Sequence, residues 1–109
     1  MRIGIVGGAE KTLSRVRYEE VARSHGCAVE FHDGHMEGRG TETLRSLVGR
    51  CDVVVIVTRV NSHNAVRLAR RLIRQHGRAA LFVPRFGLSQ FESVIDEQPL
   101  GGTQISATH

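Results

Sequence analysis

Short runs of apolar residues alternate along the chain with stretches in which apolar positions recur every three or four residues. The short runs have the composition of buried strands, and the longer stretches have the period of amphipathic helices. Four strands are predicted in this way, at residues 2–8, 28–33, 52–58 and 79–84. A helix is predicted after each strand. The clearest runs from about Ser62 to His76, with one apolar face formed by Ala65, Val66, Ala69, Leu72 and Ile73.

Residues that cap helices indicate where the helices begin. Thr12 or Ser14 is expected to cap the first helix and Thr41 the second, because their hydroxyl oxygens can accept hydrogen bonds from free backbone N–H groups. Ser89 with Glu92 has the spacing of a capping box and predicts the start of a short last helix.

Four strand–helix units with short connections predict a parallel sheet with helices on both faces. We expect a single-domain, Rossmann-like three-layer α/β sandwich with a four-stranded parallel sheet in the order 2-1-3-4. The 109 residues fit one such domain, over 1–96. Residues 97–109 contain a proline and a glycine pair without any period, and we expect a loosely attached tail or a segment used in self-association.

The predicted order makes the crevice between the first and third strands the topological switch point. Ligands of open α/β sheets bind beyond the carboxyl ends of the strands at such a point. Gly7 and Gly8 lie on one side of this crevice and residues 58–63 on the other, with residues 32–35 and Arg85 at the neighbouring strand ends.

Short motifs at all four strand ends carry a resemblance to a known family. They are Gly7-Gly8, His32-Asp33-Gly34, Thr58 with Val60 and Ser62-His63-Asn64, and Gly87-Leu88-Ser89. Together they resemble the bacterial family called domain of unknown function 2325, over roughly residues 2–95. The resemblance implies a small Rossmann-like module of unsettled function, some of whose relatives bind haem. A cysteine that often precedes the Gly-Leu-Ser motif in that family is Phe86 here, which puts a thiol role at this position in doubt.

Three histidines suggest a metal or haem site at the predicted crevice. His32 and His35 belong to one strand end and His63 to another, and neutral imidazole binds transition metals and haem iron. We expect His35 and His63 as the metal or axial ligands, with His32 beside them. A purely structural role, with each ring hydrogen-bonded locally or exposed, is the alternative.

Glycines and basic residues at the same crevice suggest that it contacts an anion. Gly7 and Gly8 lead toward a helix start, where backbone N–H groups favour negative charge, and basic or hydroxyl side chains follow nearby. The expected contacts are Gly7, Gly8, Lys11, Arg59, Ser62 and Arg85. Neither a P-loop nor a G-x-G-x-x-G sequence is present, so the pattern does not specify a nucleotide.

Composition restricts the partners and the compartment. The formal net charge is +4, and 14 of the 15 basic residues are arginine, which makes nucleic acid a possible partner. Arg67, Arg70, Arg71 and Arg74 form the polar face of the third predicted helix, but no recognition motif accompanies them, so a solvated basic surface is favoured. We expect free thiols at Cys27 and Cys51, no membrane span, no secretory signal and a cytoplasmic location.

No nucleophile is paired with an obvious base, so we expect a binding protein rather than an enzyme. The favoured hypothesis is a homodimeric module that holds haem or a metal ion through histidine for sensing, gas binding or carriage. A regulatory module that binds phosphate or a nucleotide is the first alternative. An accessory protein that binds nucleic acid is the second.

Overall fold

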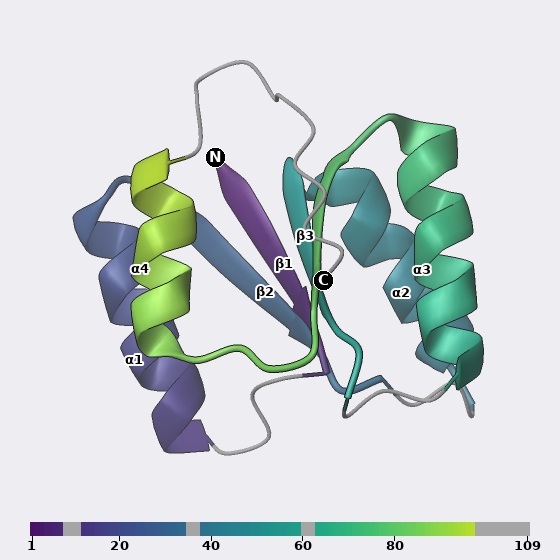
Figure 1. Cartoon of the computed structure of the whole chain (residues 1–109), viewed down its shortest axis with the longest axis horizontal. Coiled ribbons are helices and arrows are strands. Elements are labelled where there is room, and N and C mark those ends of the chain that lie inside the picture. The colour runs from purple at the N-terminus through teal and green to yellow at the C-terminus, as the bar shows by residue number, and fades with distance from the viewer. Residues whose placement is uncertain (8–11, 35–37, 60–62, 98–109) are drawn as a thin grey trace.

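Four parallel strands form the sheet at the centre of the molecule (Figure 1). The structure is a computed structural model, and it describes residues 1–7, 12–34, 38–59 and 63–97. The strands are β1 (Arg2–Val6), β2 (Ala28–His32), β3 (Val53–Val57) and β4 (Ala79–Val83), and the helices are α1 (Thr12–Ser24), α2 (Gly40–Arg50), α3 (His63–His76) and α4 (Leu88–Glu97). The spatial order β2-β1-β3-β4 and the alternation of strands with helices confirm the predicted Rossmann-like sandwich.

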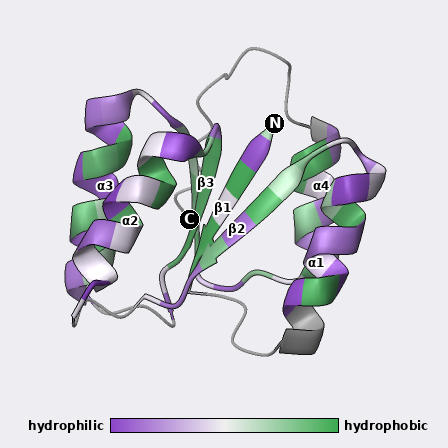
Figure 2. Cartoon of the chain, turned by 180° about the vertical axis from the view of Figure 1, so that it is seen from behind, coloured by the Kyte–Doolittle hydropathy of each residue, from purple (hydrophilic) through white to green (hydrophobic). Residues whose placement is uncertain are grey.

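The helices cover the two faces of the sheet in pairs. Helices α1 and α4 pack on one face, and α2 and α3 pack on the other (Figure 1). Apolar residues of each helix face the sheet and polar residues face outward, as the hydropathy colours show (Figure 2). Two separate cores result, one on each face of the sheet.

Strand β3 belongs to both cores, because successive side chains of a strand point to opposite faces. Val53, Val55 and Val57 pack under α1 and α4, whereas Val54 and Ile56 pack under α2 and α3. All five residues of the strand are buried. This explains why the sequence shows a continuous apolar run here instead of an alternating one.

Two predicted caps are wrong. Helix α2 begins at Gly40, one residue before Thr41, after Arg39 as the N-cap residue. Helix α4 begins at Leu88, and the side chain of Gln90 accepts a hydrogen bond from the N–H of Gly87, as the third residue of a capping box does. Ser89 and Glu92 therefore lie inside the helix, because the pair Gly87 and Gln90 caps it two residues earlier than the predicted box.

Other expectations concern the thiols, the membrane and the tail. Cys27 and Cys51 are free thiols, half-buried and buried respectively, as predicted. No helix within the described ranges is long and apolar enough to cross a membrane. Residues 98–109, most of the predicted tail, lie outside the described residues.

Candidate functional site

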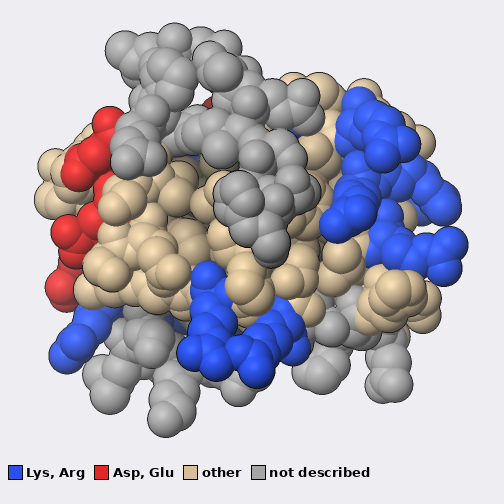
Figure 3. All heavy atoms as spheres, in the orientation of Figure 1, with Lys and Arg blue, Asp and Glu red and all other residues tan. Residues whose placement is uncertain are grey.

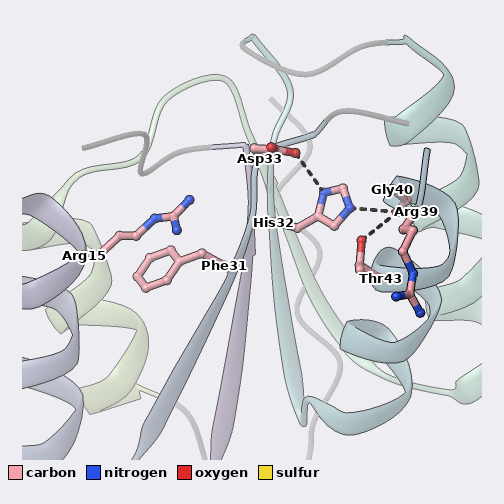
Figure 4. A pocket seen from close by; sticks show the side chains of 7 residues that line it. All are labelled: Arg15, Phe31, His32, Asp33, Arg39, Gly40 and Thr43. Carbon is pink, nitrogen blue, oxygen red and sulfur yellow. Dashed lines mark hydrogen bonds and ion pairs between the residues drawn. The ribbon is translucent and has the colours of Figure 1, made fainter. Parts of the chain in front are cut away.

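A cavity of about 360 Å³ lies at the carboxyl end of β2, the strand at one edge of the sheet. Its volume is in the range of small-molecule sites. Figure 4 shows Arg15 and Phe31 on the α1 side of the strand and the start of α2 on the other. The described residues that line it are Arg15, Phe31, His32, Asp33, Arg39, Gly40 and Thr43. We call this the β2-end cavity.

His32 holds the wall of the cavity in place. Its ring is buried, and Nδ1 accepts a hydrogen bond of 2.9 Å from the N–H of Gly34, whose φ of +88° makes the tight turn possible. Because Nδ1 is an acceptor, the proton of the neutral ring lies on Nε2, which donates to the carbonyl oxygen of Gly40 at 2.9 Å. The ring thus ties the end of β2 to the start of α2. With both nitrogens engaged, it can ligate a metal only after losing one of these bonds.

The apolar wall is the ring of Phe31, supported from behind by a cluster of aromatic rings. The guanidinium of Arg15 lies 5.3 Å from the centroid of the Phe31 ring, in cation–π contact. Tyr18 packs edge-on against Phe31 with centroids 5.8 Å apart, and it also contacts Phe86 and Phe91. Burial raises the pKa of the Tyr18 phenol, which keeps this support uncharged. The position of Phe31 is therefore fixed by packing.

The polar wall is the first turn of α2. Arg39 precedes the helix, and no side chain caps it through a hydrogen bond. The Thr43 hydroxyl donates to the carbonyl oxygen of Gly40 at 3.0 Å, which leaves its oxygen able to accept a hydrogen bond. Arg39 forms an i,i+3 ion pair with Glu42 at 3.6 Å, but both side chains are largely exposed. Such a pair is weak, and the Arg39 guanidinium can turn toward a ligand at little cost.

Charges of both signs border the cavity. Arg15 and Arg39 bring guanidinium groups from α1 and from the start of α2, and Asp33 brings a half-exposed carboxylate from the end of β2. The contact of 3.9 Å between Asp33 Oδ1 and His32 Nδ1 is not a hydrogen bond while Nδ1 accepts from Gly34. The two arginines suit a phosphate or a carboxylate, and the carboxylate of Asp33 can accept hydrogen bonds from ligand hydroxyl groups.

The described residues of the predicted site are spread over the ends of all four strands. His32 lines the cavity, and Gly7 lies beside it, because its N–H donates to the carbonyl oxygen of His32 at 2.7 Å. His63 begins α3, after the end of β3, and its side chain is exposed. Since β1 separates β2 from β3, the ends of these two strands are about 10 Å apart. The described lining of the cavity therefore includes His32 but not His63.

The remaining predicted residues fall elsewhere or are not described. Arg59 and Arg85 are exposed after β3 and β4, and the end of β4 is about 14 Å from that of β2. Gly8, Lys11, His35 and Ser62 lie outside the described residues. Across the described ranges, no group of three or more His, Cys, Asp or Glu side chains could hold a metal ion. The pairing of His35 with His63 stays a prediction.

Five lining residues were absent from the predicted crevice: Arg15, Phe31, Arg39, Gly40 and Thr43. Arg39 could have been found, because it stands directly before a helix that begins close to a strand end. Arg15 and Thr43 gave no such signal. Which side of a helix faces a strand end depends on the residue at which the helix begins, and the predicted cap of α2, Thr41, lies two residues after the observed N-cap residue, Arg39.

Comparison with known proteins gives relatives but no activity. Residues 2–98 match the model of a family described as "Uncharacterized protein conserved in bacteria (DUF2325)". A UPF0751 protein of Bacillus anthracis strain CDC 684 is 33% identical over 84 residues, which are 76% of this chain and 80% of the relative. A UPF0751 protein of Bacillus cereus strain AH820 is 32% identical over the same shares of the two chains. No solved structure matches the chain.

Proposed function

The chain belongs to this bacterial family of uncharacterised proteins, and we propose that it is a non-enzymatic module that binds a small phosphorylated ligand of the nucleotide class. The observation that carries the proposal is the placement of Arg15 and Arg39 on opposite sides of one cavity that also presents an aromatic ring and a carboxylate. In this assignment the guanidinium groups bind phosphate, the Phe31 ring contacts the base, and Asp33 accepts hydrogen bonds from sugar hydroxyls.

The position of the cavity supports the same assignment by analogy with other doubly wound folds. In many of these folds an acidic residue that follows the second strand binds a ribose, and phosphate lies at the start of a helix. Asp33 follows β2 directly, and the cavity adjoins the first turn of α2. This analogy concerns the fold alone, so the proposal rests mainly on the chemistry of the residues that line the cavity.

The haem or metal hypothesis has less support from the described residues. The ring nitrogens of His32 are both engaged, and only His63 of the other candidates is described. A visible absorption spectrum, recorded on the purified protein and again after titration with haem, tests it separately. A Soret band lost in both His35→Ala and His63→Ala would restore haem as the main hypothesis.

Thermal denaturation with added ligands tests the proposed function. A ligand at a hundred times its dissociation constant stabilises the folded state by about 2.7 kcal/mol, which raises the melting temperature of a chain this size by roughly 10 °C or more. We expect nucleoside phosphates to produce this shift. Inorganic phosphate should act more weakly, because it makes no contact with Phe31 or Asp33.

Matched variants then locate the site. Arg15→Gln and Arg39→Gln each remove one charged contact and should weaken binding about tenfold or more. Arg17→Gln on α1 and Arg45→Gln on α2 are the controls, because both are exposed and neither lines the cavity. The proposal fails if no nucleotide shifts the melting temperature, or if the controls weaken binding as much as the cavity variants do.

A further inference from the structure

The outer face of α3 carries a dense stripe of arginines, far from the β2-end cavity. Helix α3 contains no acidic residue, and its exposed arginines are Arg67, Arg70, Arg71 and Arg74. At 100° per residue these four lie within an arc of about 100°, and they extend about 10 Å along the axis. Figure 3 shows basic side chains gathered over α3, while acidic side chains gather at the opposite edge of the same view. We call these four residues the arginine stripe.

The stripe has no neutralising partners on its own helix or among the described ion pairs. No ion pair between described residues includes any of the four. Like charges three and four residues apart on a helix repel one another, so the stripe opposes the stability of α3. Other arginines have structural tasks: Arg50 pairs with Glu30, and Arg78 donates to the carbonyl oxygens of Val48 and Gly49 at the end of α2.

An aromatic ring borders the stripe. The guanidinium of Arg70 lies 4.7 Å from the centroid of the Phe82 ring, which belongs to β4 at the edge of the sheet. Phe82 is only half-buried and packs against the core under α2 and α3. The ring and the guanidinium that lies over it therefore form a cation–π pair beside a row of positive charges.

We infer that the arginine stripe and Phe82 form a binding surface for single-stranded nucleic acid. A row of guanidinium groups with one sign of charge matches the repeating phosphates of a polyanion, and a neighbouring ring–guanidinium pair offers a stacking platform for bases. Only unpaired bases can reach such a platform, which favours a single strand over a duplex. An acidic protein surface would match the charge of the stripe but would make no use of the aromatic pair.

The number of phosphate contacts sets the expected salt dependence. Four contacts to a single strand give a slope of about −3 for the logarithm of the binding constant against the logarithm of the salt concentration. Raising the salt from 50 to 200 mM should therefore weaken binding roughly sixtyfold. Removing three of the four charges should leave a slope of about −0.7.

Fluorescence anisotropy with a labelled oligothymidine of about twelve nucleotides tests the inference. The triple variant Arg67→Gln, Arg71→Gln and Arg74→Gln should lose both affinity and salt dependence. Glutamine has a helix propensity close to that of arginine, so α3 should persist, and far-UV circular dichroism verifies that it does. The control variant Arg17→Gln, Arg23→Gln and Arg45→Gln removes the same charge from exposed positions on α1 and α2 and should bind as the wild type does.

Two further measurements distinguish nucleic acid from other polyanions and partners. Phe82→Leu should weaken binding several-fold without changing the salt slope, because it removes stacking and keeps the charges. The inference is overturned if polyglutamate competes as well as the oligonucleotide does, if duplex DNA binds as tightly as the single strand, or if the two triple variants behave alike. Sedimentation at low salt tests whether the stripe binds a second copy of the chain instead. Self-association that only the stripe variant abolishes would show this and would overturn the inference.

Discussion

Gly4 is the residue at which the packing of the sheet is most sensitive to one added methyl group. It lies in β1, the strand that pairs with both β2 and β3, and its backbone faces α2. A Cβ atom built there would lie within 3.0 Å of Leu47 Cδ2 and 2.9 Å from Cys51 Sγ. Both neighbours are buried in the core under α2 and α3, so neither can move into solvent.

The expected cost of Gly4→Ala follows from this crowding. Overpacking of a core by one carbon costs about 1–3 kcal/mol. Alanine also lowers the conformational entropy of the unfolded chain, which returns about 0.4–1 kcal/mol. We therefore expect a net loss of about 1–2 kcal/mol in the free energy of unfolding, or a decrease in melting temperature of roughly 5–15 °C.

Urea unfolding followed by far-UV circular dichroism measures this loss. Gly49→Ala is the control, because the nearest atom to its added Cβ, His76 Cε1, is 3.8 Å away and alanine favours the helix more than glycine does. This control should stabilise the protein by about 0.5–1 kcal/mol.

A double-mutant cycle with Leu47→Ala gives the decisive comparison. Removal of the leucine side chain relieves the closer of the two contacts and leaves the one with Cys51 Sγ, so Gly4→Ala should cost clearly less, though still something, in that background. A neutral Gly4→Ala variant, or an unchanged cost in the Leu47→Ala background, would refute the close approach of α2 to β1.

Three further expectations concern individual side chains. His32→Ala should lower the free energy of unfolding, measured in urea, by about 1–3 kcal/mol, since it removes two hydrogen bonds. His32→Asn keeps an acceptor and should recover part of this loss. Equal stability of the wild type and both variants would contradict the role of the ring. Hydrogen bonding from Arg50 lowers the pKa of Glu30, so the wild type should exceed Glu30→Gln in stability by a constant amount above pH 4.5. This difference in the free energy of unfolding should decline as the pH falls below that value. A difference that does not change with pH would count against the ion pair. Burial raises the pKa of the Cys51 thiol to about 12, so a thiol reagent at pH 8 should label Cys27 in the native protein and Cys51 only after unfolding, as mass spectrometry would reveal.

The fold could be predicted because it depends on many residues at once. The apolar run of β3 and the single apolar face of α3 each involve five or more side chains, so one unusual residue cannot reverse the pattern. The predictions of the helix caps were wrong because each cap depends on which of a few neighbouring residues bonds the free backbone N–H groups. The side chain of Gln90 accepts a hydrogen bond from the N–H of Gly87, so the helix already begins at Leu88 and Ser89 lies within it. The spacing of the apolar residues of α4 does not reveal this.

The predicted crevice and the β2-end cavity both lie at the carboxyl ends of the strands, but the crevice was placed between β1 and β3, and the cavity lies at the end of β2. The carboxyl ends of the strands follow from the direction of the chain, which the sequence reveals. The lining of a cavity depends instead on the loops and helix starts that surround it. His32 illustrates the difference: its type suggested a ligand, whereas its two hydrogen bonds assign it to the support of the α2 start. A histidine cannot be assigned to either role until the partners of both nitrogens are known.

The arginines show why composition alone could not separate the possible functions. A net charge of +4 permits a structural, a ligand-binding or a nucleic-acid-binding role for every one of them. The structure divides them by what their guanidinium groups contact: backbone carbonyls at the end of α2 for Arg78, the Phe31 ring beside a cavity for Arg15, and the Phe82 ring beside a row of like charges for Arg70. Lysine could supply the same charge at each place, but it lacks the flat group that stacks on a ring or bonds two carbonyls at once. Contact geometry therefore accounts for arginine rather than lysine at these three positions, one of which borders the cavity and another of which belongs to the stripe.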